Sequence, residues 1–414
     1  MQSFARRLED GGALSCAGVC PAAQPFFAAL LHAIFPQRPL VIVAPDLKTQ
    51  ESFQQDLETW LALQSQVPSP KSKAGEAPSS LFFPAWEVLP HEGKLPHADV
   101  ISDRLQALVL LSENSKLKTQ NSKLIVASVT ALLQKTFPPG EIQKRTRTLA
   151  RGDKIAPLDL IEFLEEQGCE PEAQVSQKGE IALRGGIVDV WPLTSPWPVR
   201  LEFFGDELES LRYFDPLTQI SREEISSVTL PPAGELGILK NGIQKSEARG
   251  QSQTALATLL DYLPRETIFL LCEPESLAIH ADAYEQQIPK DDPFFISWPD
   301  FLIELNRRSF TSIELGDVEA GGVNSQSLPR QSQAETGAIR NPQFDSLDAF
   351  RSLAERAPEL PVAEAQRREF FQQLHRWLRQ GYSVHVFCNN DGERQRFEEI
   401  WQEMGLASGV SALG

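Results

Sequence analysis

The chain is 414 residues long and carries 39 Lys and Arg against 56 Asp and Glu, a formal net charge of −17. This length predicts about two to four domains, and a hydrophobic content of 41% with 23% charged residues excludes wholesale disorder. A surface this acidic repels phosphate, which excludes wrapping of nucleic acid over the whole molecule. A local basic groove stays open as an alternative.

The N-terminus and the cysteines indicate a cytoplasmic protein without a membrane anchor. Residues 1–12 lack the apolar stretch of a signal peptide, and no run reaches the ~18 apolar residues of a membrane helix. The five cysteines are scattered, as is typical of reduced thiols. Cys16 and Cys20 form the only close pair, and no second Cys or His pair supports a zinc site. We therefore expect these two cysteines to be buried or idle.

The first 145 residues read as a parallel α/β domain. Residues 40–44 and 124–127 predict buried strands, each followed by a helical pattern, and Asp46 can cap the first of these helices. Residues 64–80 and 112–123 look like surface insertions in this domain, and no internal repeat is apparent.

Residues 146–232 predict a hairpin-rich antiparallel α+β domain inserted into the first. A helix is expected at 158–167 and strands at 180–191, 199–204 and 208–214, with a turn at Gly205-Asp206. Residues 233–320 then return to the first sheet, with a helix at 254–263 and a buried strand at 267–271. After a Gly/Ser/Gln-rich linker at 321–345, residues 346–414 form a small α/β domain with helices at 362–379 and 393–404 and a strand at 383–387.

The first domain has the layout of a P-loop motor, so its phosphate-binding groups can be tested. Where the loop belongs, Gly18 is followed by Ala23, Gln24 and Pro25 in the places of Gly, Lys and Ser/Thr. Proline also lacks the N–H group that would bind phosphate. A P-loop motor also has an apolar strand that ends in a metal-binding Asp. The matching strand here ends in Cys272, where Asp would hold Mg²⁺, and Glu273 survives beside it. These losses predict no ATPase activity and no cofactor, although a generic α/β sheet without a P-loop ancestor explains the pattern equally well.

Longer blocks carry a specific resemblance. Residues 38–46 (Arg-Pro-Leu-Val-Ile-Val-Ala-Pro-Asp) and 184–192 (Arg-Gly-Gly-Ile-Val-Asp-Val-Trp-Pro) resemble the amino-terminal module of the bacterial transcription-repair coupling factor, Mfd. So do residues 47–49, 82–90, 99–105, 125–129 and 200–212. Several blocks are shared with the excinuclease subunit UvrB, as are residues 259–264. Together they span about residues 14–275, and the C-terminal unit resembles the family's next small domain only weakly.

Two differences from UvrB favour the coupling factor as the nearer resemblance. UvrB has a working P-loop and an aromatic-rich β-hairpin that clamps damaged DNA, whereas residues 83–99 leave no room for such a hairpin. The coupling factor's module resembles UvrB but lacks both features. The resemblance therefore implies a degenerate, helicase-like sheet domain of the UvrB type (1a/1b), with the antiparallel insertion as its domain 2. It also implies a fragment or truncated form, since the RNA-polymerase-binding domain and DNA translocase motor of the family are not present in the sequence.

The antiparallel domain offers a candidate binding face. In residues 199–204, Val199, Leu201 and Phe203 alternate with Arg200, Glu202 and Phe204, so the first set faces the core. From the residues alone, Phe204 is a scattered surface aromatic, and the arginines pair with Glu202 or Asp206.

The resemblance implies instead that this domain contacts UvrA through the matching positions Arg184, Arg200 and Phe204. We then expect Arg200→Ala or Phe204→Ala to weaken UvrA binding while leaving the melting curve intact.

Other patterns are weaker. Basic residues gather at the domain boundary, where they indicate a solvated face more than a DNA contact: Lys144, Arg145, Arg147, Arg151 and Lys154. His91 and His97 lie near Glu92 and Asp99 but have no complementary metal ligands elsewhere. We assign no catalytic and no metal-binding residue, because no Ser-His-Asp or Cys-His arrangement can be placed.

The leading hypothesis is a non-catalytic platform that recruits UvrA in transcription-coupled nucleotide excision repair. It would meet RNA polymerase and DNA only through domains outside this chain. The alternatives are a UvrB-type ATPase with a divergent nucleotide site, or a DNA-binding module.

Overall fold

The computed structural model of the chain describes residue 8 and residues 12–66, 80–113, 123–248, 256–316, 360–380, 384, 386 and 391–403. The chain divides into two compact units, Met1–Gln343 and Phe344–Gly414. The expected linker at 321–345 lies outside the described residues. Within the described part of the chain, no helix has the length and apolar character needed to cross a membrane.

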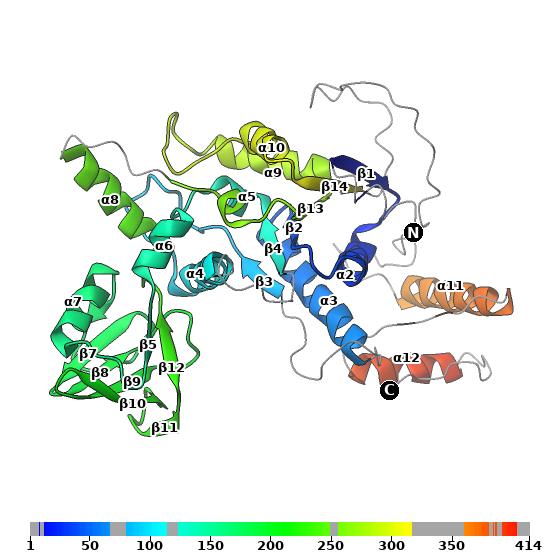
Figure 1. Ribbon diagram of the computed structural model, residues 1–414. Helices are drawn as coiled ribbons and strands as arrows, with labels where there is room; N and C mark the ends of the chain where they lie inside the picture. Colours follow the sequence, from blue (N-terminus) through cyan, green and yellow to red (C-terminus); the bar gives the residue numbers. More distant parts are fainter. Residues whose placement is uncertain are drawn as a thin grey trace. The chain divides into compact units, whose positions relative to one another are not determined.

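The first unit contains a six-stranded sheet in the order β1-β14-β13-β2-β4-β3, and all of its strand pairs are parallel (Figure 1). Its strands are β1 (Ala13–Ala17), β2 (Leu40–Ala44), β3 (Ser80–Phe83), β4 (Leu124–Ser128), β13 (Ile268–Cys272) and β14 (Thr311–Gly316). The predictions of strands at 40–44, 124–127 and 267–271 are confirmed. Two distant segments of the chain thus build one parallel sheet, which is consistent with the predicted helicase-like fold.

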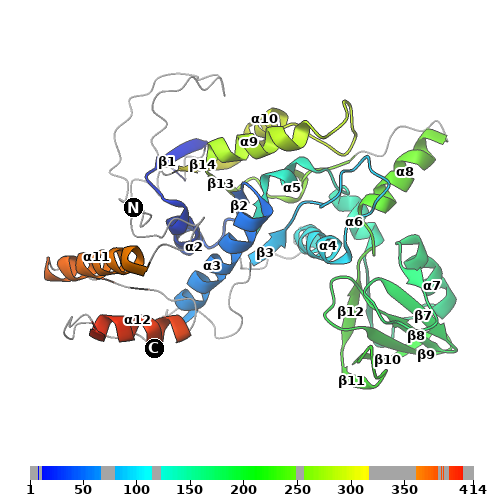
Figure 2. The same ribbon diagram turned by 180° about the vertical axis from the view of Figure 1, so that it is seen from behind.

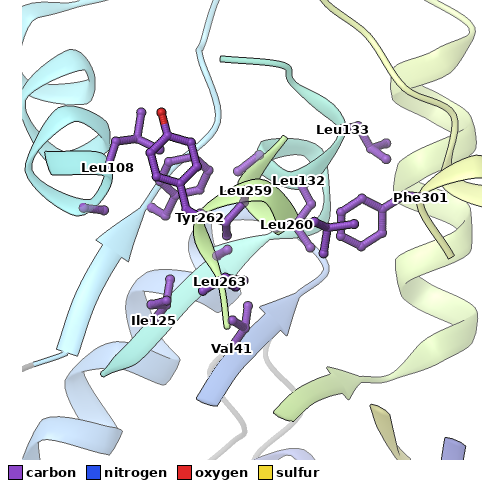
Figure 3. Packing of buried hydrophobic residues seen from close by; sticks show 14 of the residues in the cluster. Val41, Leu108, Ile125, Leu132, Leu133, Leu259, Leu260, Tyr262, Leu263 and Phe301 are labelled. Carbon is purple, nitrogen blue, oxygen red and sulfur yellow. The ribbon is translucent and has the colours of Figure 1, made fainter. Parts of the chain in front are cut away.

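Helices cover both faces of this sheet, which explains why its central strands are buried along their whole length. One face carries α2 (Gln24–Ile34) and α3 (Leu47–Gln66), and Figure 2 shows both from behind. The other face carries the helices α4 (Ala98–Glu113), α5 (Val129–Leu133), α9 (Pro274–Glu285) and α10 (Trp298–Arg307). Figure 3 shows the core on this face, where Val41 and Ile125 of the sheet meet Leu108, Leu132 and Phe301.

The antiparallel module forms a second sheet in the order β11-β10-β9-β8-β7-β6, packed against α7 (Pro157–Glu166). Its strands are β6 (Glu170–Pro171), β7 (Glu180–Arg184), β8 (Ile187–Val190), β9 (Val199–Phe204), β10 (Glu207–Phe214) and β11 (Ser221–Glu224). All pairs in it are antiparallel except β6 with β7. Val199 and Leu201 are fully buried in its core, so the predicted alternation of faces along β9 is confirmed.

Short elements connect the two sheets. A two-stranded antiparallel pair joins β5 (Arg147–Ala150) to β12 (Ser227–Leu230), and α6 (Pro139–Arg145) and α8 (Leu236–Ala248) flank it in the sequence. The pair therefore brings together the points where the chain enters and leaves the antiparallel module.

Two sequence predictions are wrong in this unit. Residues 180–191 form a hairpin in place of one strand, because Gly185 (φ 64°) and Gly186 make a two-residue turn between β7 and β8. The helix expected at 254–263 is a short 3-10 turn, Leu259–Tyr262, with a capping box between Thr258 and Asp261; residues 254 and 255 lie outside the described part. Its spaced leucines mimic a helical period although the turn ends within four residues.

A buried ion pair joins the start of α8 to the parallel sheet domain. Arg104 of α4 and Glu235 are both fully buried, with Arg104 Nε 2.8 Å from Glu235 Oε2. The carboxylate also accepts from Trp86 Nε1 at 2.9 Å and from Thr136 Oγ1 at 2.6 Å. The guanidinium lies over the rings of Phe83 and Trp86. Glu235 lies between the end of β12 at Leu230 and the start of α8 at Leu236, so this network fixes the chain where it leaves the antiparallel module.

The second unit contains the helices α11 (Leu360–Arg379) and α12 (Asp391–Glu403). Its small core is formed by Phe371 and Leu374 of α11 against Trp401 of α12. Both predicted helices are confirmed. The strand predicted at 383–387 lies largely outside the described residues.

Candidate protein-binding site

The loop predicted to be a degenerate phosphate loop lies between β1 and α2. Gly18 has a φ of 79°, and the next turn begins at Pro21. Three backbone N–H groups of the loop donate within the protein: Val19 N to Gly316 O, Ala23 N to Cys20 O, and Gln24 N to Pro21 O. Because a phosphate cradle needs free N–H groups, these bonds leave little for a phosphate to bind.

The side chain of Gln24 closes the same loop from inside. It is 3% exposed, and its Nε2 donates to Glu273 Oε1 at 2.6 Å and to Val19 O at 3.3 Å. Glu273 follows β13 and adopts a left-handed backbone conformation with a φ of 54°. Gln24 and Glu273, which are 249 residues apart in the sequence, are therefore bonded to one another at the edge of the sheet.

Cys272 stands beside this pair and is 1% exposed. Burial raises the pKa of its thiol well above the ordinary range, and the charge of Glu273 raises it further. A protonated thiol is a poor metal ligand. Cys16 and Cys20 are also buried free thiols, as predicted. Within the described residues, no group of three or more His, Cys, Asp and Glu could hold a metal ion.

The segment between β3 and α4 bears on two predictions made from the sequence. Residues 84–97, all described, contain no strand, so the expectation that no UvrB-like β-hairpin is inserted here is confirmed. His97 Nδ1 lies 3.6 Å from Asp99 Oδ2, and both side chains are 73% exposed, which makes them a surface pair.

The basic residues of the domain boundary each have a neighbour within the protein. Lys144 pairs with Glu141, Arg145 donates to Gln167, Arg147 lies over the ring of Phe163, and Arg151 pairs with Glu224. Lys154 is paired with Glu207 through the backbone, in an isolated β-bridge. The solvated-face interpretation is therefore favoured over a DNA contact.

Arg184 and Arg200 meet at one buried carboxylate on the outer face of the antiparallel sheet. Asp189 of β8 is 1% exposed. Arg200 binds it through two bonds, Nε to Oδ1 at 2.8 Å and Nη2 to Oδ2 at 2.9 Å, and the Arg184 Nη2 lies 2.8 Å from the same Oδ2. The hydrogen bonds that Arg200 donates to Asp189 raise the pKa of its guanidinium. One carboxylate is thus shared by two cations.

The two arginines differ in exposure. The side chain of Arg184 is 45% exposed, whereas that of Arg200 is 15% exposed and lies over the ring of Phe214. The expected pairing with Glu202 or Asp206 is therefore wrong. The expectation that Arg200→Ala leaves the melting curve intact does not follow from this geometry either, because truncation removes the two-bond partner of the buried Asp189 carboxylate.

Phe204 is 77% exposed at the end of β9. The turn that follows it is braced, because Phe203 N donates to Gly186 O and Ile155 N donates to Asp206 O, both at 2.8 Å. Phe204 lies four residues from Arg200, about 13 Å along the strand, so the structure does not bring its ring into the arginine cluster. The sheet therefore exposes the Arg184 guanidinium and, at a separate place, the Phe204 ring, which is held on a hydrogen-bonded turn.

Sequence reasoning missed Asp189 and Glu235, and only Asp189 left a signal. Asp189 interrupts the apolar run Ile187–Val190, and a carboxylate in such a run needs a buried partner. Glu235 comes after Pro231, Pro232 and Gly234, and nothing in this loop-like sequence indicates that its side chain is buried.

Comparison with known proteins gives a family for the antiparallel module and relatives for most of the chain. Residues 148–236 match the family described as the UvrB interaction domain. The chain is 33% identical over 322 residues to a transcription-repair-coupling factor of Haemophilus influenzae, which covers 66% of this chain and 27% of that protein. Proteins of the same name from Escherichia coli (33% over 159 residues) and Myxococcus xanthus (30% over 263 residues) match 38% and 64% of this chain. The matches span 13% and 20% of those two relatives, so the chain corresponds to about a quarter or less of each relative's length.

Proposed function

Because this chain is a UvrB-like module of the transcription-repair-coupling factor family, we propose that it recruits the excinuclease subunit UvrA in transcription-coupled nucleotide excision repair. The observation that carries the proposal is Phe204, an aromatic side chain that is 77% exposed within the matched interaction domain. Large exposed aromatic residues and arginines are the side chains that most often dominate binding energy at protein interfaces. The same matched domain contributes Arg184, whose side chain is 45% exposed at the end of β7.

We further propose that the module is non-catalytic and takes no nucleotide, and that its parallel sheet is a degenerate counterpart of the UvrB motor domain. The internal bonds of the loop and the hydrogen bond between Gln24 and Glu273 support this proposal. An amide at position 24 supplies no positive charge for a triphosphate. In this proposal the chain works in the cytoplasm, and contacts with RNA polymerase and DNA belong to parts of the relatives that it does not match.

The test is a calorimetric titration of the chain with purified UvrA, first as wild type and then as Phe204→Ala. We expect the wild type to bind and the variant to bind about tenfold or more weakly, with an unchanged Tm. Leu158→Ala is the matched control, because Leu158 is 69% exposed on α7 of the same module. Equal affinity of wild type and Phe204→Ala would remove Phe204 from the interface, and no binding by the wild type would end the proposal.

The competing hypothesis, a UvrB-type ATPase with a divergent nucleotide site, is tested separately. Fluorescent ATP and Mg²⁺ are titrated into the same preparation, and we expect no saturable binding. Saturable binding that depends on Glu273 would favour the enzyme instead.

A further inference from the structure

The loop between β10 and β11 exposes two large apolar side chains beside the arginine cluster. Leu217 is 91% exposed and Ile220 is 67% exposed, and both lie within the matched interaction domain. Single exposed apolar residues are common on protein surfaces and mean little alone. The arrangement around these two is what distinguishes them.

The loop is held in one conformation by its own hydrogen bonds. Asp215 Oδ1 accepts from the backbone N–H groups of Leu217 and Thr218, both at 3.0 Å, and Asp215 N donates to Ile220 O at 3.0 Å. Gln219 has a φ of 60°, a left-handed conformation that non-glycine residues seldom adopt. A loop with this many local bonds loses little conformational entropy when a partner binds it.

The arginine cluster attaches to this loop directly. Arg200 Nη1 donates to Gln219 O at 3.2 Å, and Arg184 Nη2 donates to Gln219 Oε1 at 3.2 Å. The candidate patch and the loop therefore form one continuous surface. Asp189 pairs with both Arg184 and Arg200, and Asp215 of the loop pairs with Arg222. These three arginines and two carboxylates leave one formal positive charge beside Leu217, and the Arg184 side chain is 45% exposed.

Resting on the proposed function, we propose that the Asp215–Ile220 loop is a second contact segment for UvrA. Leu217 and Ile220 enter an apolar hollow of the partner, and Arg184 faces acidic groups at its rim. Arg200 holds the loop and Arg184 in place. Continuity with the Arg184 patch, and the position of the loop within the matched interaction domain, point to this occupant.

The experiment measures UvrA affinity of the full chain by calorimetry for Leu217→Asp, Leu217→Lys and Leu158→Asp, with Tm recorded for each. Leu217→Asp should weaken binding about tenfold or more, because it removes an apolar contact and adds charge of the same sign as the partner's rim. Leu217→Lys should weaken it less, and Leu158→Asp should bind as the wild type does. All three should keep the wild-type Tm, since the replaced side chains are largely exposed.

The outcomes separate this inference from the function on which it rests. If the wild type binds and Phe204→Ala weakens binding while Leu217→Asp does not, the loop is not a contact segment although UvrA recruitment stands. Equal losses for Leu217→Asp and Leu158→Asp would also overturn the loop proposal, since added negative charge alone would explain them. No binding by the wild type would remove both proposals.

Discussion

Replacing Glu235 with alanine is expected to destabilise the first unit more than any surface change. The substitution leaves the Arg104 guanidinium fully buried without its carboxylate, and it removes the acceptor of Trp86 Nε1 and Thr136 Oγ1. Breaking a buried ion pair by removing one partner costs about 3–5 kcal/mol. The remaining acceptors of Arg104, which are Pro84 O at 2.8 Å and Gln134 Oε1 at 3.3 Å, offset only part of that cost because neither carries a charge.

The assay is urea unfolding followed by tryptophan fluorescence, to which Trp86 contributes as a buried member of the network. With a denaturant slope of about 3 kcal/mol per molar, a loss of ~4 kcal/mol lowers the midpoint by roughly 1 M. Glu141→Ala is the control, because it breaks the exposed pair with Lys144, and exposed pairs contribute little to stability.

A double variant distinguishes a buried charge from lost packing. Arg104→Met with Glu235→Leu replaces the ion pair by apolar groups of similar size, which is often neutral or stabilising. We expect the double variant to unfold at a higher urea concentration than Glu235→Ala alone. If Glu235→Ala unfolds with the wild-type midpoint, or if the double variant is the less stable of the two, the pair does not act as a dry, fully paired charge cluster.

Three further predictions follow from single contacts. Arg200→Ala should lower the free energy of unfolding by about 2 kcal/mol, measured by urea denaturation, because it takes two bonds from the buried Asp189; an unchanged midpoint would contradict this. Gly186→Ala should cost about 1–3 kcal/mol, seen as a lower Tm, since the added Cβ would lie 2.8 Å from Phe203 O; a wild-type Tm would show that the turn can shift freely. Because burial raises the pKa of the Cys272 thiol and shields it, iodoacetamide at pH 8 should modify it only after unfolding, as checked by mass spectrometry; rapid labelling of the native chain would refute that burial.

Elements defined by local patterns could be predicted from the sequence. Strand β2 is a run of β-branched and apolar residues that is buried on both sides, and α11 repeats its apolar residues at helical spacing. Strand β1, Ala13–Ala17, was missed because its small residues and serine carry no strand pattern, and its place is set by pairing with β14 about 300 residues later. Register between distant segments has no local signal, so the sheet order came only with the structure.

Only part of the candidate site could be predicted from the sequence. Phe204 could be predicted as exposed because it alternates with the core residues of β9, which is a local property. The roles of Arg184 and Arg200 could not, since both depend on the buried Asp189 across the β7–β8–β9 register. An arginine on a polar strand face has the same sequence pattern whether it contacts a partner or a carboxylate of its own sheet.

The bond between Gln24 and Glu273 bears on the proposal that the parallel sheet is a motor fold without phosphate contacts. In the proposed function, no nucleotide bridges the ends of β1 and β13. The Gln24 amide donates to the Glu273 carboxylate at this sheet edge, and it also donates to Val19 O in the loop itself. This bond joins the end of β13 to the start of α2 within the chain itself, which supports the proposal of a module that takes no nucleotide.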